Sequence, residues 1–149
     1  MRQYLLDLFK ALAHSDKYFN ILLVDPEGTI RLKLREGPVQ LLPESLRVLK
    51  LAIAEKKPFL TEIHRGTPEL PQHIDAIAPL IITSGSAETV AGALILVTDL
   101  RDFLLPLLQF WPLPSGSAEG LLVVRQEDHA TLYSQGLNTE TNGLKRNFS

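Results

Sequence analysis

The alternation of apolar and polar positions divides the first part of the chain into helices and strands. Apolar residues recur at helical spacing over residues 2–16 and 43–56, which predicts two amphipathic helices. Between them, "YFNILLVDPEGTIRLKL" places two apolar runs on either side of Asp-Pro-Glu-Gly. Proline and glycine favour a tight turn there, so we expect a β-hairpin.

Three more apolar runs follow the second helix, "FLTEIHRG", "HIDAIAPLIIT" and "ETVAGALILVTDL", and turn-rich segments separate them. Together with the first hairpin they predict a five-stranded antiparallel sheet. Asp99 is better explained as the N-cap of a third helix reaching Leu108 than as a catalytic base. "LLVVRQEDHATLYS" predicts one further hairpin. The expected fold class is therefore α+β, with a long N-terminal helix and helices on one face of the sheet.

Composition narrows the classes of function. The chain has 149 residues and 45% hydrophobic content, enough for one domain with an appendage. With 15 basic and 17 acidic residues the net charge is -2, which argues against a nucleic-acid partner. The absence of cysteine excludes disulfides, thiol nucleophiles and cysteine zinc sites. The longest apolar runs are shorter than the roughly 18 to 20 residues that cross a bilayer.

Several segments resemble a known family. "NILLVDPEGTI", "KPFLTEIHRG", "HIDAIAPLI" and "VAGALILVTDL" are similar to the PAS-like Cache modules of extracytoplasmic sensor regions in bacterial histidine kinases and diguanylate cyclases. The segment "LLPLLQFWPLPSGSAEGLLVVRQED" resembles the passage between the two modules of a double-Cache sensor. The resemblance implies a membrane-distal module at residues 1–111, a linker at 112–119, and the first hairpin of a truncated second module at 120–149.

The resemblance also implies a function. We expect the extracytoplasmic, periplasmic ligand-sensing part of a membrane-anchored signal-transduction protein, with a small-molecule ligand, no enzymatic activity of its own and no membrane contact by this fragment. An attached kinase or cyclase would lie outside the chain. The alternative is a ligand-free dimerisation or spacer module, in which the N-terminal helix pairs with a second copy. The serines in glycine-containing loops show no nucleophile motif, which agrees with the absence of catalysis.

One group of polar residues stands out. If His64 lies opposite His73 in a hairpin, Glu62 lies opposite Asp75, and all four side chains share one face because side chains alternate along strands. The simplest interpretation is a solvated hairpin face. A ligand pocket and a divalent-metal site remain as alternatives, since two imidazoles and two carboxylates suit either. We expect Glu62, His64, His73 and Asp75 to bind the ligand, without a metal or another cofactor.

Overall fold

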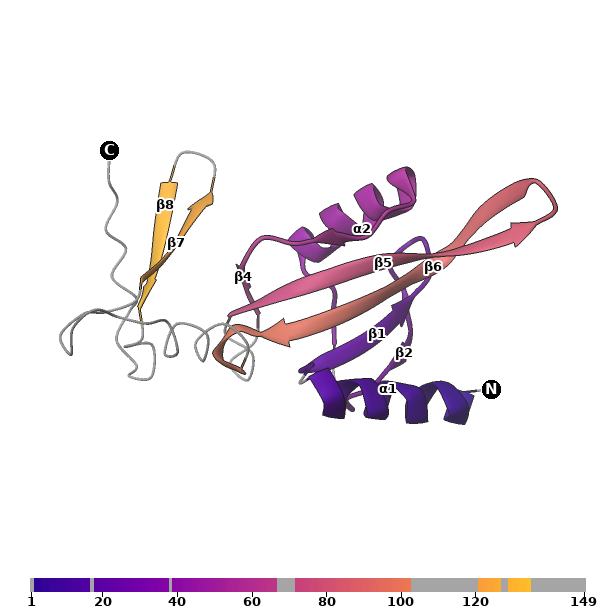
Figure 1. The fold of residues 1–149 in the computed structure, drawn as a ribbon, viewed down its shortest axis with the longest axis horizontal. Coiled ribbons are helices and arrows are strands. Elements are labelled where there is room, and N and C mark those ends of the chain that lie inside the picture. The colour runs from indigo at the N-terminus through magenta and orange to yellow at the C-terminus, as the bar shows by residue number, and fades with distance from the viewer. Residues whose placement is uncertain are drawn as a thin grey trace. The chain divides into compact units, whose positions relative to one another are not determined.

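The computed structural model describes residues 2–16, 18–37, 39–66, 72–102, 121–126 and 129–134, with side chains described up to residue 102 except at 15, 16 and 65. The chain forms two compact units, Met1–Leu100 and Arg101–Ser149. The elements, shown in Figure 1, are α1 (Arg2–Asp16), β1 (Asn20–Val24), β2 (Ile30–Lys33), α2 (Pro43–Glu55), β3 (Phe59–Leu60), β4 (His64–Arg65), β5 (Gln72–Ser84), β6 (Ala87–Asp99), β7 (Leu121–Gln126) and β8 (His129–Ser134).

The first unit contains an antiparallel sheet in the order β2-β1-β6-β5-β3, and the short strand β4 also pairs with β5. Because β3 and β4 occupy the same edge of β5 one after the other, the sheet has five strand positions. This confirms the α+β class and the five-stranded antiparallel sheet. The arrangement is compatible with a PAS-like fold.

The two helices lie on opposite faces of this sheet, so the expectation of helices on one face was wrong. Helix α1 lies below the sheet and α2 above it in Figure 1. In β1, Ile21 belongs to the apolar cluster beneath α1, whereas its neighbour Leu22 belongs to the cluster beneath α2. The reason is visible in the continuous apolar run of β1, since a strand buried on both faces does not alternate.

Local sequence features explain where the elements end. Asp25 accepts hydrogen bonds from the backbone of Gly28 and, through its carboxylate, of Thr29, which closes the predicted turn between β1 and β2. Helix α2 begins with Pro43 in its first turn, as expected, and ends at Glu55, followed by the C-cap Lys56, whose φ of 53° is left-handed. Gly92 also has a positive φ, 154°, and a Cβ there would collide with the carbonyl oxygen of Val24.

Strands β7 and β8 form an antiparallel hairpin in the second unit, which confirms the hairpin predicted for this segment. Helical structure begins at Leu100, so Asp99 stands at the expected N-cap position. The rest of the expected third helix, the linker at 112–119, the boundary at 111 and the polar tail lie outside the described residues. No helix in the described ranges is long and apolar enough to span a membrane.

Candidate functional site

The site begins at an irregularity in the edge strand beside β5. Leu60 pairs with Ala76, and Thr61 continues this register because its N–H donates to the carbonyl oxygen of Asp75 at 2.9 Å. At the start of β4, however, His64 pairs with His73. Two residues on the edge therefore stand opposite a single residue of β5, which is a β-bulge. The expected pairing of the two histidines is confirmed.

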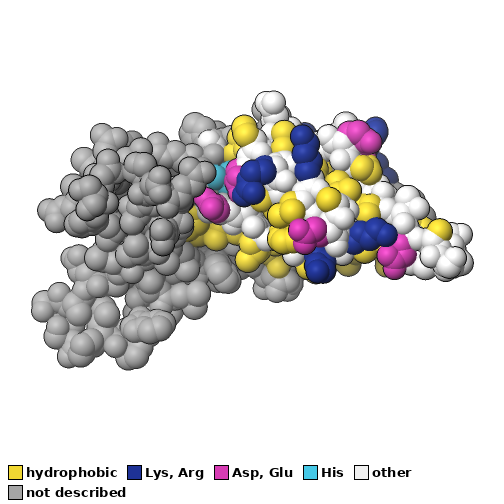
Figure 2. Space-filling view, turned by 90° about the horizontal axis from the view of Figure 1, so that it is seen from above, with side chains coloured by type: hydrophobic (Ala, Val, Ile, Leu, Met, Phe, Trp, Pro, Cys, Tyr) yellow, Lys and Arg dark blue, Asp and Glu magenta, His cyan; other side chains and the backbone are white. Residues whose placement is uncertain are grey.

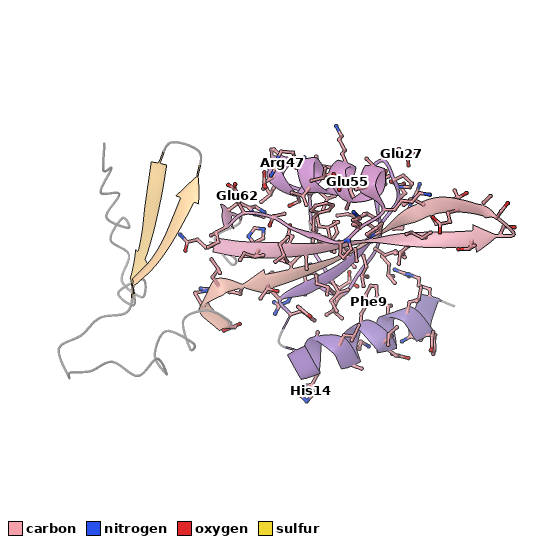
Figure 3. All side chains as sticks on the ribbon, turned by 45° about the horizontal axis from the view of Figure 1, so that its top comes forward. Phe9, His14, Glu27, Arg47, Glu55 and Glu62 are labelled. Carbon is pink, nitrogen blue, oxygen red and sulfur yellow. The ribbon has the colours of Figure 1, made fainter. Side chains whose placement is uncertain are left out.

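The bulge removes Glu62 from the group of side chains predicted to converge. Because Thr61 lies opposite Asp75, the next residue turns its side chain to solvent, and Glu62 is exposed. Figure 3 shows Glu62 at the surface near one end of α2, the end that also carries Arg47. The prediction that Glu62 shares a face with His64, His73 and Asp75 was therefore wrong. Only its backbone takes part, since its carbonyl oxygen lies 2.9 Å from Nδ1 of His64.

The remaining three residues do converge, and α2 adds a fourth. Ser45 donates its hydroxyl hydrogen to Oδ2 of Asp75 at 2.6 Å, and its Oγ lies 3.3 Å from Nε2 of His64. Oδ2 of Asp75 also lies 3.7 Å from Nε2 of His64, and Oδ1 of Asp75 lies 3.8 Å from Nε2 of His73. The two imidazole rings are 4.1 Å apart between centroids. We call these four residues, Ser45, His64, His73 and Asp75, the polar cluster.

The polar cluster is buried between the first turn of α2 and the sheet. His73 and Asp75 are 5% and 2% exposed, and only His64 is half-buried. Nδ1 of His73 and Oδ1 of Asp75 have no hydrogen-bond partner among the described residues. Buried polar atoms are nearly always paired, because an unpaired one costs about 1–3 kcal/mol. Nδ1 of His73 and Oδ1 of Asp75 are therefore available to bind a ligand. Leaving them unpaired gives the fold no stability.

Burial also changes the protonation of these groups. The pKa of His73 is lowered from 6.5 to about 4, mainly by desolvation and then by the charge of His64, whereas the charge of Asp99 opposes both. Desolvation raises the pKa of the Asp75 carboxyl, although the hydrogen bond from Ser45 opposes this. Near neutral pH the cluster therefore contains an uncharged imidazole at His73, with a free electron pair on one nitrogen.

A serine, a histidine and an aspartate this close raise the question of nucleophilic catalysis. In a catalytic triad the serine donates to the histidine, and the carboxylate orients the other ring nitrogen. Here the hydroxyl of Ser45 donates to Asp75, and Nδ1 of His64 faces the carbonyl oxygen of Glu62. Ser45 is also only 2% exposed. This arrangement suits binding through the imidazoles and the carboxylate better than attack by Ser45.

Sequence reasoning missed Ser45 and Thr61. Thr61 accepts the backbone hydrogen bond of Asp75 through Oγ1 at 2.9 Å and so fixes the strand at the site. Ser45 stands 30 positions before Asp75, and no spacing rule relates a first helical turn to a strand at that distance. The available signal was indirect, since Ser45 falls on the same helical stripe as the buried Val48, Leu49 and Ala52.

Of the other histidines, only the side chain of His14 is described, and it does not join the cluster. His14 is exposed on α1 and points away from the sheet, whereas Phe9 on the same helix points toward it (Figure 3). The side chain of His129 lies outside the described residues. The space-filling view of Figure 2 shows mixed apolar and charged side chains over this face of the first unit.

A comparison of the sequence with models of known protein families and with curated proteins gave no match.

Proposed function

We propose that this chain is the ligand-sensing part of a membrane-bound signal-transduction protein, with residues 1–111 forming a Cache-type PAS-like module. On this proposal the domain lies on the extracytoplasmic side and is anchored through parts of the full-length protein outside this chain. The segments quoted above, which resemble Cache modules, support the family. The observation that carries the binding function is the buried polar cluster with its unpartnered atoms.

The position of the cluster suits a conformational signal. Its side chains come from three elements, α2, β4 and β5, so a ligand that contacts all of them ties the helix to the edge of the sheet. His73 also pairs with Asp99, the last residue of β6, where the chain leaves the sheet. Binding would favour the arrangement in which these elements are closest, by as much as the ligand's affinity differs between the two arrangements.

We infer that the domain itself is not an enzyme. The hydroxyl of Ser45 donates to Asp75 rather than to the imidazole of His64, and Ser45 is almost completely buried. A kinase or cyclase activity would belong to another domain of the full-length protein, and the ligand would act on it through conformation.

The second candidate is a ligand-free dimerisation or spacer module. It is favoured by α1, where Tyr4 and Leu8 are 70% and 44% exposed although both are apolar enough to pack. They stand four positions apart and so lie on one side of the helix, away from the sheet. A symmetric contact between two α1 helices would cover them. This candidate predicts a dimer whose stability does not depend on any small molecule.

A thermal-shift screen of the full chain tests the proposed function. Small organic acids, amines and divalent cations are added singly to wild type and to Asp75→Asn, with Glu62→Gln as the matched control because Glu62 is exposed. A ligand of the cluster should raise the melting temperature of wild type and Glu62→Gln but not of Asp75→Asn. A conformational role further requires that the same ligand slow amide exchange in α2 and β4.

The proposal is contradicted if no compound distinguishes wild type from Asp75→Asn, or if the ligand leaves exchange in α2 unchanged. If the protein is instead a dimer that Tyr4→Lys converts to a monomer, and no ligand shifts its melting temperature, the spacer function is correct.

A further inference from the structure

Three potential metal-ligand atoms converge in the buried cluster. One donor atom from each of His64, His73 and Asp75 lies within 4.8 Å of the other two. Nitrogen and carboxylate ligands bind zinc at about 2.0–2.2 Å, so two ligands of a tetrahedral ion are separated by about 3.3–3.6 Å. Nε2 of His64 lies 3.7 Å from Oδ2 of Asp75, and Nε2 of His73 lies 3.8 Å from Oδ1 of the same carboxylate. Small side-chain rotations would therefore bring the donors to coordination distance.

We propose that His64, His73 and Asp75 form a binding site for a divalent transition-metal ion, and that this ion is the ligand of the sensing function proposed above, on which the inference rests. No metal was expected from the sequence, because the pairing of the two histidines was only an assumption there. In the structure the two histidines do pair, and Ser45, not Glu62, is the fourth residue of the cluster.

Hydrogen bonds around the donor groups fix their orientation before an ion binds. Nδ1 of His64 faces the carbonyl oxygen of Glu62 at 2.9 Å, so an N–H at that position leaves the electron pair of Nε2 facing the cluster. Ser45 donates a hydrogen bond to Oδ2 of Asp75. Thr61 forms hydrogen bonds with both the backbone N–H and the backbone carbonyl oxygen of Asp75. A histidine oriented by a carbonyl and a hydrogen-bonded carboxylate are the usual surroundings of protein metal ligands.

The atoms left without partners are the second, independent observation. Nδ1 of His73 and Oδ1 of Asp75 are buried and have no hydrogen-bond partner within the described ranges. An ion would satisfy Oδ1 directly. It would also bind one nitrogen of His73, whichever of the two a rotation of the ring presents.

The charges near the cluster favour a cation. Asp75 is inside it, Asp99 lies opposite His73 across the β5–β6 pairing, and Glu44 interacts electrostatically with both His64 and Asp75. Arg47 of α2 is paired with Glu44 at 2.7 Å and does not contact the cluster in any described interaction. An anion would meet three carboxylates in a poorly solvated place, whereas a divalent cation would be attracted by them.

The donor types indicate which metals fit. Imidazole nitrogen binds Zn²⁺, Co²⁺, Ni²⁺, Cu²⁺ and Fe²⁺ well, whereas Mg²⁺ and Ca²⁺ prefer oxygen ligands throughout. Two histidines and one carboxylate leave at least one coordination position for water, for the Oγ of Ser45 or for a further small molecule. His64 is the most exposed of the three ligands, with 12% of its side chain exposed.

The test uses the full, untagged chain freed of metal with a chelator. Zn²⁺ and Co²⁺ are titrated calorimetrically, and the melting temperature is measured with Mg²⁺ as the comparison cation. We expect one equivalent of Zn²⁺ or Co²⁺ to bind, and Zn²⁺ at 100 times its dissociation constant to raise the melting temperature by about 10 °C or more. Mg²⁺ at the same concentration should give no shift.

Variants identify the ligands. His64→Gln, His73→Gln and Asp75→Asn should each weaken Zn²⁺ binding at least about 10-fold. Glu62→Gln and His14→Gln remove an exposed carboxylate and an exposed histidine and should bind as wild type does. His64→Gln replaces the least buried ligand and so keeps the test valid if either buried substitution unfolds the chain. Loss of the visible Co²⁺ absorption in His64→Gln is a second, independent measurement.

The inference is overturned if wild type binds neither ion, or if His64→Gln binds as tightly as wild type. It is also overturned if the His14→Gln control loses binding. The failure of the proposed function has a different signature. If Zn²⁺ does not bind but an organic ligand shifts wild type and not Asp75→Asn, sensing stands without the metal. If Zn²⁺ binds and exchange in α2 is unchanged, the metal site stands and sensing fails.

Discussion

The uncharged state of buried His73 should make the metal-free domain lose stability on mild acidification. The pKa of His73 is lowered from 6.5 to about 4, chiefly by burial, so the unfolded chain takes up this proton first as the pH falls. The folded state is therefore penalised from about pH 6.5 downward, and the penalty is complete only below the folded pKa. A lowered histidine pKa thus destabilises at acid pH and has no effect well above pH 7.

The size of the effect follows from the same two values. One pKa unit corresponds to about 1.4 kcal/mol, so the gap between 6.5 and about 4 limits the loss to about 3 kcal/mol. Between pH 7 and pH 5 the expected loss is about 2 kcal/mol. His73 is only 5% exposed, so solvent screens the effect little. For a domain of this size such a loss is a large part of the total stability.

The assay is urea unfolding followed by circular dichroism at pH 7, 6 and 5 with chelator present. His73→Gln removes the titrating group, so its stability should fall by about 2 kcal/mol less than that of wild type over this range. The raised pKa of Asp75 acts in the opposite sense, stabilising the fold as the pH falls, and Asp75 is present in both proteins. His14→Gln should retain the wild-type pH dependence.

The reasoning is refuted if wild type and His73→Gln lose stability in parallel between pH 7 and pH 5. It is refuted equally if wild type becomes more stable than the variant on acidification, because that sign requires a raised histidine pKa.

Three further predictions concern the fold. Gly92→Ala should destabilise by about 3 kcal/mol or more, because the new Cβ meets the carbonyl oxygen of Val24; a loss below about 1 kcal/mol in urea unfolding would contradict the close approach. Asn20→Ala should cost about 2–3 kcal/mol, since the buried Oδ1 accepts two backbone N–H groups, one of them from Arg35, and both are left unpaired; an unchanged urea midpoint would count against this. Removing residues 112–149 should leave a cooperative thermal transition, since the first unit contains both long helices and the whole five-position sheet; a broad, non-cooperative melt would contradict that.

Local signals in the sequence predicted most of the elements. Helical periodicity located α1 and α2 within about one residue, and Asp-Pro-Glu-Gly located the turn between β1 and β2. The side of the sheet on which each helix packs was misjudged, although the continuous apolar run of β1 carried that information. A strand that does not alternate has both faces covered.

The candidate site was predictable only in part, because its geometry depends on one extra residue. Pairing His64 with His73 could be proposed from the hairpin pattern, and it is correct. The bulge after Thr61 could not be foreseen, since no glycine or proline marks it, and a shift of one residue sends a side chain to the opposite face. For that reason Glu62 was included in the predicted site. Ser45 was left out because it comes from a helix.

The most direct test of the buried cluster as a ligand site is an anomalous diffraction map of the zinc-soaked, untagged chain, recorded on both sides of the zinc absorption edge. We expect one dominant peak at about 2.0–2.2 Å from a ring nitrogen of His64, a ring nitrogen of His73 and an oxygen of Asp75. A zinc-saturated crystal with its anomalous peak at another histidine, or with the cluster closed around no ion, would contradict it.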